Sequence, residues 1–290
     1  MFLQRLHHRF TRFGKVKVEP KTADTSVERT YYCATVQTEG KPFKLLLSRP
    51  GFVEDKIARG KPWEENLVSI ICFFMRADGV YLDIGANIGY FCFHVARSLD
   101  TSLSIAFEPH PLLYAQLLEN LRFNSDLSSN ICVHNAAVGD VTGETEFHMQ
   151  RLSSYNRGLS SVLPNADLRG EYEAIKTKMV TLDTVLDDTH KGRIAVMKID
   201  VQGYELQVIA GAMETIAKSK PIIIFEFEAN YHGSKAAAAF DSIVTRLADY
   251  RIFLIKEKSP EFFAEFDRSK VSKEGFEGNF ICFPHGRLNC

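Results

Sequence analysis

The residues that could bind a ligand or take part in catalysis lie where apolar runs of the sequence end. Residues 83–89 read Asp-Ile-Gly-Ala-Asn-Ile-Gly, and they overlap the end of an apolar strand expected at residues 80–84. Glycine lets a chain turn sharply and lets a ligand approach the backbone, while the N–H groups at a helix start attract polar ligand groups. A strand, a tight turn and a helix in this order predict a nucleotide-type site at the carboxyl edge of a parallel sheet.

The spacing in this loop narrows the expected ligand. The pattern is G-x-N-x-G, with Gly85, Asn87 and Gly89, and the third glycine of the dinucleotide fingerprint is absent. Asp83 would repel a pyrophosphate, but its carboxylate suits a cofactor with a cationic amino group and a sulfonium. Glu108 follows 25 residues later at the end of the next expected strand, where a carboxylate can accept hydrogen bonds from ribose hydroxyls. We therefore predict S-adenosylmethionine as the cofactor.

Small residues follow the third expected strand. Residues 135–140 read Asn-Ala-Ala-Val-Gly-Asp, so the chain there could flank an adenine ring and offer backbone N–H groups to it. The predicted cofactor-binding residues are Asp83, Gly85, Ala86, Asn87, Gly89, Glu108, Pro109, Ala137, Val138 and Asp200.

Acidic residues at the ends of two later strands are the candidate catalytic groups. Asp200 and Glu205 flank a glycine turn, and Glu226 and Glu228 share one face of a strand, where an unpaired carboxylate is too costly for the core. His232 follows in a loop, with a pKa range suited to a base. Each of the five could take a proton from an acceptor hydroxyl. Asp200 and Glu205 could instead stabilise a helix start, and His232 could be a surface histidine.

Two further sequence features leave narrower choices. Residues 63–65 read Trp-Glu-Glu, and they could cover the cofactor or merely pack at a helix start. No set of His, Asp and Glu residues has clear metal-ligand spacing, so no metal is predicted.

The elements that must position these residues alternate regularly. Near-continuous apolar strands separated by helices predict a Rossmann-like α/β fold, a seven-stranded, mostly parallel sheet with helices on both faces. The expected strands span residues 80–84, 102–107, 130–138, 194–199, 221–227, 251–255 and 279–283. The expected helices span residues 88–99, 111–124, 204–217 and 235–249. A small extra strand is expected at residues 145–149, and residues 150–178 are expected to form a long functional or mobile loop.

Six segments, in this order, resemble the FkbM family of methyltransferases: YLDIGANIGYF, AFEPHP, NAAVGD, LDTVL, KIDVQGYELQVIAGA and IIIFEFE. The resemblance covers residues 81–228, about half of the chain. It implies a class I methyltransferase fold and methyl transfer from S-adenosylmethionine, usually to a hydroxyl oxygen of a sugar, glycan or polyketide-like metabolite. It also implies cofactor roles for Asp83, Gly85, Asn87 and Glu108. Gln202 stands where many members have glutamate.

The remaining N-terminal part reads as an extension. Residues 1–65 are predicted to carry a basic tail, a linker at 19–30 and a hairpin of strands 31–36 and 43–48. Residues 66–290 are predicted to form the methyltransferase domain. A helix expected at 64–76 spans the boundary between the two parts. Apolar side chains at helical spacing among the basic residues of the tail could pack on the domain, contact a membrane surface or partner, or act as a targeting peptide.

Composition excludes several other classes. The net charge is -1, so nucleic acid is not an expected partner, and the longest apolar run, residues 67–75, is too short to span a membrane. Without a continuous apolar signal segment, a cytoplasmic protein with a small-molecule or glycan acceptor is predicted. Two alternatives remain. A nicotinamide-dependent oxidoreductase is disfavoured by the missing glycine, and a non-catalytic binding protein by the presence of Asp83, Glu108 and Asp200.

Overall fold

The computed structural model describes residues 16–20, 30–38, 40–151, 154–164, 172–256, 262–271 and 275–287. Most of the basic tail expected at the N-terminus lies outside these residues, and so does most of the expected linker. Among the described residues, no helix is both long and apolar enough to cross a membrane.

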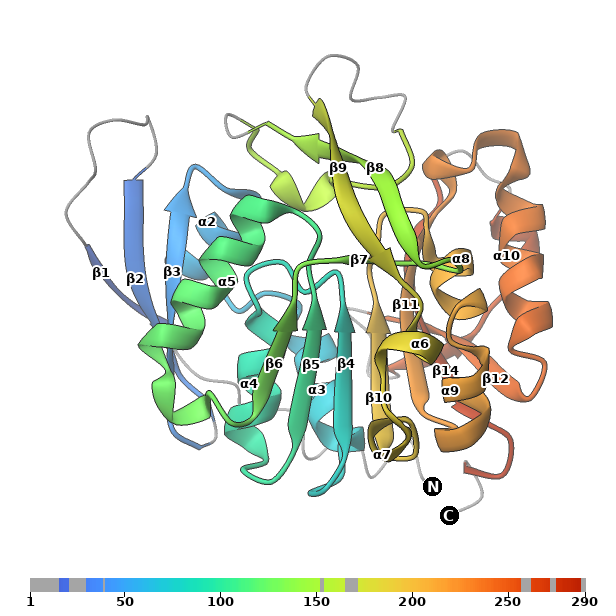
Figure 1. The fold of residues 1–290 in the computed structure, drawn as a ribbon, viewed down its shortest axis with the longest axis horizontal. Coiled ribbons are helices and arrows are strands. Elements are labelled where there is room, and N and C mark those ends of the chain that lie inside the picture. Colours follow the sequence, from blue (N-terminus) through green and yellow to red (C-terminus); the bar gives the residue numbers. More distant parts are fainter. Residues whose placement is uncertain are drawn as a thin grey trace.

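One large mixed sheet forms the centre of the molecule (Figure 1). Its eight strands lie in the order β13 (Phe263–Glu265), β12 (Tyr250–Ile255), β14 (Glu277–Pro284), β11 (Ile222–Glu228), β10 (Ile194–Ile199), β4 (Val80–Ile84), β5 (Leu103–Phe107) and β6 (Ile131–His134). The strands from β11 to β6 are parallel, and β14 runs antiparallel to both of its neighbours. The seven expected strands are all present, and the unpredicted β13 adds an eighth at one edge. The expected α/β fold with a mostly parallel core is therefore confirmed.

Two apolar cores lie on opposite faces of this sheet, because successive strand residues point to opposite sides. On β4, Tyr81 packs into one core, while Val80, Leu82 and Ile84 pack into the other. The first core is covered by α3 (Glu65–Phe74), α4 (Tyr90–Ser98) and α5 (Pro111–Phe123). The second is covered by α8 (Glu205–Ala210), α9 (Met213–Ser219) and α10 (Ala236–Arg246).

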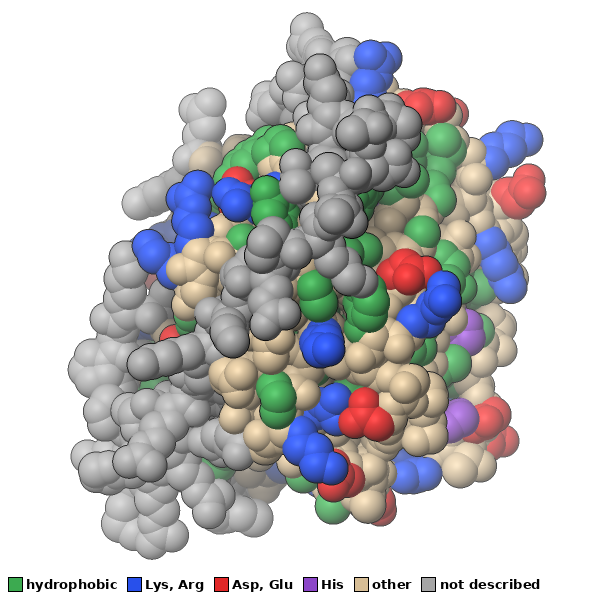
Figure 2. Space-filling model, turned by 90° about the vertical axis from the view of Figure 1, so that its left-hand side faces the viewer, with side chains coloured by type: hydrophobic (Ala, Val, Ile, Leu, Met, Phe, Trp, Pro, Cys, Tyr) green, Lys and Arg blue, Asp and Glu red, His purple; other side chains and the backbone are tan. Residues whose placement is uncertain are grey.

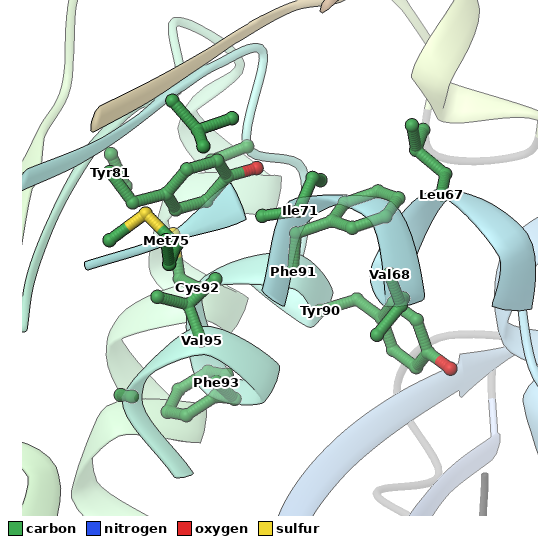
Figure 3. Close-up of a cluster of buried hydrophobic side chains, with 14 of the residues drawn as sticks. Leu67, Val68, Ile71, Met75, Tyr81, Tyr90, Phe91, Cys92, Phe93 and Val95 are labelled. Carbon is green, nitrogen blue, oxygen red and sulfur yellow. The ribbon is translucent and has the colours of Figure 1, made fainter. Parts of the chain in front are cut away.

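Contacts between α3 and α4 form one part of the first core. Leu67, Val68 and Ile71 of α3 face the aromatic side chains of α4, and Tyr81 closes the cluster from β4 (Figure 3). These helices hold the loop between β4 and α4 against the end of the sheet.

The predicted hairpin is present and belongs to a second sheet. Strands β2 (Thr30–Val36) and β3 (Phe43–Arg49) pair antiparallel, and β1 (Val16–Pro20) adds a third strand. The predicted linker at 19–30 is therefore wrong at both ends, since those ends lie in β1 and β2. An unpredicted helix, α2 (Phe52–Ala58), follows the hairpin.

Two asparagines, one in α5 and one directly after it, tie this hairpin to the main domain. Asn120 Oδ1 accepts a hydrogen bond from the N–H of Leu46 at 2.6 Å, and Asn124 Oδ1 accepts one from the N–H of Lys44 at 2.8 Å. Because these residues are one helical turn apart, their side-chain amides accept hydrogen bonds from two outward-facing N–H groups of β3 and cover its unpaired edge.

A third, small sheet corrects two expectations. The predicted strand 130–138 ends at His134, and Ala137–Val138 (β7) pairs instead with β9 (Tyr172–Val180). Strand β9 also pairs antiparallel with β8 (Gly143–Gln150), so the predicted loop 150–178 is wrong over its last residues. Most side chains of β9 are exposed or half-buried, and β9 therefore gives little apolar alternation in the sequence.

The predicted helix 204–217 is interrupted. It forms α8 and α9, and the chain between them passes so close to a neighbouring loop that a Cβ on Gly211 would lie 1.9 Å from the carbonyl oxygen of Gly139. Two short helices, α6 (Leu182–Val185) and α7 (Asp188–Lys191), precede β10.

The described surface carries mixed charge. On the face in Figure 2, basic and acidic side chains are interspersed, which agrees with the net charge of -1.

Candidate active site

A cavity of about 1070 Å³ lies where the parallel strands of the large sheet end. Several predicted site residues line it: Gly85, Ala86, Asn87, Glu108, Pro109, Ala137, Val138, Asp200, Glu226 and Glu228. Four others, Asp83, Gly89, Glu205 and His232, do not line it. The sequence segments from strands β4, β5, β10 and β11 are thus brought together at one site.

The loop after β4 is fastened to its neighbours by its backbone. The N–H groups of Gly85 and Ala86 both donate to the carbonyl oxygen of Phe107, at 3.0 and 3.1 Å. Gly85 has φ +83°, and a Cβ there would lie 1.8 Å from the carbonyl oxygen of Asp200. Glycine is therefore required here because the loop presses against the end of β10. The N–H groups of Gly85 and Ala86 are therefore used within the protein.

Glu108 is held rigidly beside this loop. Its Oε2 accepts a hydrogen bond from the N–H of Asn87 at 2.7 Å, and its Oε1 accepts one from the N–H of His110 at 2.9 Å. Burial raises the pKa of Glu108 to about 7, although both hydrogen bonds act to lower it. A carboxylate oxygen has a second lone pair, so each can still accept a hydrogen bond from a ligand in the cavity.

Asp83 lies beneath the cavity. Its side chain is fully buried, and its Oδ2 accepts a hydrogen bond from the thiol of Cys92 at 3.2 Å. Burial raises the pKa of Asp83, while the ammonium of Lys198 acts to lower it. Gly89 allows close packing rather than facing the cavity, because a Cβ there would crowd Phe93 and Leu117 between α4 and α5.

A network of polar side chains forms the wall next to the loop. Lys198 Nζ lies 3.0 Å from Asp200 Oδ2 and 4.9 Å from the ring centre of Phe91. Gln202 Nε2 donates to Asp200 Oδ1 at 2.9 Å and to Glu226 Oε2 at 3.0 Å. Asp200 and Glu226 are therefore linked, although 26 residues separate them in the sequence. The sequence interpretation assigned no role to Lys198. A charged residue at the end of an otherwise apolar strand could have indicated a site residue.

The other predicted catalytic residues have different surroundings. Glu228 lines the cavity opposite Glu277 of β14, and burial, followed by the charge of Glu277, raises its pKa to about 7. Glu205 Oε1 accepts a hydrogen bond from the N–H of Gly203 at 3.0 Å at the start of α8, which is the helix-start role considered from the sequence. His232 stacks on Phe227, with ring centres 4.9 Å apart, and burial lowers its pKa.

One wall of the cavity comes from a segment that we call the strap, residues 154–164. Arg157 in the strap is buried, and its guanidinium lies 2.5 Å from Glu54 Oε1, with further hydrogen bonds to Ser48 and Gln116. The N–H of Phe52 donates to the carbonyl oxygen of Tyr155 at 2.9 Å. The strap is thereby fixed to the N-terminal hairpin and α2. The sequence interpretation missed Arg157, since its partner is 103 residues away.

Aromatic and acidic side chains complete this wall. Trp63, Glu64 and Glu65, for which a cofactor lid and a helix start were both considered, line the cavity just where α3 begins. The ammonium of Lys56 lies 4.3 Å from the ring centre of Trp63 and 4.5 Å from that of Phe52. Within the described part of the chain, no group of three His, Cys, Asp or Glu residues is arranged to hold a metal ion.

Comparison with known proteins identifies the family to which most of the large-sheet domain belongs. Residues 83–252 match the family model described as the methyltransferase FkbM domain. The chain belongs to the FkbM methyltransferase family. Residues 83–252 are accordingly an S-adenosylmethionine-dependent methyltransferase domain, and the nicotinamide alternative is set aside.

Two curated relatives and one solved structure resemble this FkbM methyltransferase. The AMB antimetabolite synthetase AmbE of Pseudomonas aeruginosa is 28% identical over 189 residues, which cover 56% of this chain and 9% of that protein. Methyltransferase 1 of Beauveria bassiana is 22% identical over 147 residues, covering 46% and 58%. The crystal structure of an FkbM methyltransferase from Methylobacillus flagellatus has a TM-score of 0.47 at 20% identity, covering 73% of this chain and 45% of that chain. The chain spans 9% and 58% of the lengths of the two curated relatives.

The residues of the FkbM methyltransferase site fit the cofactor. Glu108 is a buried carboxylate that lines the cavity with acceptor capacity left over, which matches two ribose hydroxyls. Phe107, Ala137 and Val138 give an apolar wall of the kind that an adenine ring requires. The cavity is at the upper end of the usual range for ligand pockets, about 300–1,000 Å³, so a cofactor and an acceptor can share it.

Proposed function

We propose that the protein transfers the methyl group of S-adenosylmethionine to a hydroxyl oxygen of a sugar, glycan or polyketide-like acceptor, with Asp200 as the proton acceptor. The position of Asp200 carries this proposal. Its N–H donates to the carbonyl oxygen of Ile84 at 2.9 Å, directly beside the loop after β4, and its side chain lines the cavity. Asp200 is therefore a candidate base that is bonded to the end of β4 and is linked through Gln202 to Glu226.

The cofactor roles follow from the same geometry. Glu108 would bind the ribose hydroxyls, Ala86, Pro109, Ala137 and Val138 would enclose the nucleoside, and Gly85 and Asn87 would keep the loop in place. Asp83 would act from beneath the cavity, since its carboxylate attracts the buried ammonium of Lys198, which also pairs with Asp200. Gly89 would maintain the packing of α4 rather than contact the ligand.

The chain itself supplies alignment and proton transfer. When bound, S-adenosylmethionine supplies a methyl carbon activated by its sulfonium, and its sulfur keeps the electron pair of the broken C–S bond. Asp200 takes the hydroxyl proton as the new O–C bond forms. Alignment of two reactants can contribute about 7–11 kcal/mol, and a positioned base about 10²- to 10⁴-fold in rate.

Glu228 is the rival base, and pH separates the two. Burial opposes ionisation of Asp200, but the charge of Lys198 and the surrounding hydrogen bonds bring its pKa below its ordinary value. The pKa of Glu228 is raised to about 7. With Asp200 as base, kcat/KM for the acceptor, measured at saturating S-adenosylmethionine, therefore stays high as the pH falls through about 7, whereas with Glu228 it falls in that range.

The acceptor is expected to lie against the strap and the start of α3. On the sequence alone, we expect residues 31–65, 150–178 and 229–235 to select the acceptor. Cavity-lining residues from the first two segments, such as Trp63 and Arg157, support that expectation, whereas none of residues 229–235 lines the cavity.

A methyl-transfer screen tests the proposal. Methyl-labelled S-adenosylmethionine is offered with panels of sugars, glycans and polyketide alcohols, and label transfer is followed for wild type, Asp200→Asn and Glu205→Gln. Glu205 is the matched control, a buried carboxyl close in sequence that does not line the cavity. We expect Asp200→Asn to lose about 10²- to 10⁴-fold in kcat with S-adenosylhomocysteine binding kept. Retained turnover in Asp200→Asn would move the base to the segment from Glu226 to His232.

A further inference from the structure

Gln202 makes an unusual set of contacts at the site. Its amide nitrogen donates to Asp200 Oδ1 at 2.9 Å and to Glu226 Oε2 at 3.0 Å, so both of its N–H bonds are directed at carboxyl groups. Its amide oxygen accepts a hydrogen bond from the hydroxyl of Tyr231 at 2.7 Å. Because a carboxylate can accept but not donate, the amide nitrogen must face the carboxyl groups, and the amide oxygen is left to accept from Tyr231.

The backbone of Gln202 is also constrained. It has φ 55°, a left-handed conformation that residues other than glycine rarely adopt. Its carbonyl oxygen accepts a hydrogen bond from Ser161 Oγ at 2.7 Å, so the strap holds the turn that carries the side chain. The side chain is mostly buried and lines the cavity.

The two carboxyl groups joined by Gln202 are not equivalent. Asp200 has a direct ion-pair partner in Lys198, and for Glu226 the structure gives contacts to Gln202 and Asp200. Two carboxyl groups held this close cannot both ionise freely. Burial, and then the charge of Asp200, raise the pKa of Glu226 well above its ordinary value, whereas that of Asp200 is lowered.

We propose that Gln202 is a positioning residue of the methyl-transfer site: its amide holds Asp200 and Glu226 as one pair, with the proton on Glu226 and an ionised Asp200 facing the cavity. The inference rests on the proposed role of Asp200 as base. Neither donor of Gln202 would remain in a glutamate, so the pair depends on the amide rather than on the length of the side chain.

The other charged groups around this pair come from several elements. Among the described residues, Lys198 on β10 is the cation that pairs with Asp200. The other groups that act on Asp200 or Glu226, or feel their charge, include the carboxyls of Asp83, Glu64, Glu108, Glu205 and Glu228. In this acidic surrounding, loss of a neutral donor leaves Lys198 as the main group that keeps Asp200 ionised.

Titration of the carboxyl groups tests the proposal without an acceptor. The full-length protein is labelled with ¹³C at aspartate and glutamate carboxyls, and the Asp200 and Glu226 signals are assigned with Asp200→Asn and Glu226→Gln. In wild type we expect Glu226 to stay protonated at neutral pH. In Gln202→Ala we expect the midpoint of Asp200 to rise by about one to two pH units, a tenfold to hundredfold change in proton affinity. Gln202→Glu is expected to raise it further.

Two additional variants keep this test decisive. Tyr231→Phe retains the amide but removes the hydrogen bond to its oxygen, so a smaller rise in the Asp200 midpoint is expected. Gln207→Ala removes a nearby amide of α8 that does not line the cavity, and it is expected to leave the midpoint unchanged. An unchanged Asp200 midpoint in both Gln202→Ala and Gln202→Glu, with thermal denaturation confirming that they fold, would overturn the proposal.

The outcome is separable from that of the proposed function. If wild type fails to bind S-adenosylhomocysteine in calorimetry, the proposed function fails, and the titration still reports whether Gln202 holds the pair. If wild type binds it and Asp200 titrates identically in all Gln202 variants, only the role of Gln202 fails.

Discussion

The two halves of the cavity are built in different ways. The cofactor half comes from one continuous stretch, residues 84–138, in which three successive parallel strands end side by side and backbone hydrogen bonds join their loops. The proposed acceptor half is assembled from α2, the start of α3, the strap and the end of β11. It is joined by side chains, above all the ion pair of Arg157 and Glu54.

This difference bears on how each half can vary. A site made of strand ends and backbone contacts follows directly from the fold, so its ligand is tied to the architecture. A site whose walls are separate segments can change its shape by changing one segment. We infer that the cofactor half fixes the reaction class, whereas the strap and the N-terminal segment select the acceptor.

Substitution of Gly85 should give the largest effect and break the cofactor half. In Gly85→Ala the new Cβ would lie 1.8 Å from the backbone of Asp200, and φ +83° would be strained as well. We expect more than about 4–5 kcal/mol of lost stability and no measurable binding of S-adenosylhomocysteine. Gly233→Ala is the matched control, because φ is also positive there but the added Cβ meets open space. It should cost only about 1–2 kcal/mol. Similar denaturation curves for the two variants would contradict the crowding at Gly85.

The second-largest effect is expected for Arg157→Met, which should destabilise the acceptor half. It leaves the buried carboxylate of Glu54 without its cation, and removal of one partner of a buried pair costs about 3–5 kcal/mol. We expect a large fall in melting temperature and faster hydrogen exchange at the N–H of Phe52, which bonds to the strap.

The control for Arg157 is Lys218→Met. Lys218 pairs with Asp188 at the surface, where the side chains are 40% and 84% exposed, so the expected loss is about 0–1 kcal/mol. If the two variants lose equal stability, the strap is not held by its buried ion pair.

Glu108→Ala should affect the cofactor half alone, and it therefore tests whether the two halves bind their ligands independently. Loss of a charged hydrogen-bond acceptor for the ribose corresponds to about 1.5–3 kcal/mol, a weakening of S-adenosylhomocysteine binding by tenfold or more. Glu228→Ala removes a carboxylate from the opposite wall and should leave this affinity nearly unchanged. Equal affinities for wild type and Glu108→Ala in calorimetry would mean that Glu108 does not hold the ribose.

The smallest expected effect is a pH dependence of cofactor-product binding. The pKa of Glu108 is raised to about 7 in the free protein, and hydrogen bonds from ribose hydroxyls favour its ionised form. Binding should therefore release a proton near neutral pH, and affinity should fall severalfold between about pH 8 and about pH 6. The dependence should vanish in Glu108→Gln and persist in Glu205→Gln, whose carboxyl has a similar pKa but does not line the cavity. A pH dependence that survives in Glu108→Gln would assign it to another group.

The sequence predicted the cofactor half far better than the acceptor half, for physical reasons. Strands β4 and β10 are buried on both faces, and each is apolar except for one charged residue near its end, so the sequence marks their limits. Asn87 follows β4 and Glu108 follows β5, and these strands are parallel neighbours, so the two residues come together at the same end of the sheet. The burial of Asp83 beneath the site could not be read from its spacing.

The missed features depend on contacts between distant segments. Strand β9 buries few side chains and is defined by its pairing with β8. Arg157 looks like any surface arginine in a polar loop until its ion pair with Glu54 is seen. Gln202 was noticed only as a departure from the family pattern, because its meaning lies in its bonds to Asp200 and Glu226.

Calorimetric titration of the wild-type protein with S-adenosylhomocysteine tests the central claim most directly. The account predicts one-to-one binding that weakens tenfold or more in Glu108→Ala, with no comparable binding of a nicotinamide dinucleotide. Absence of binding to the folded wild-type protein would contradict the account.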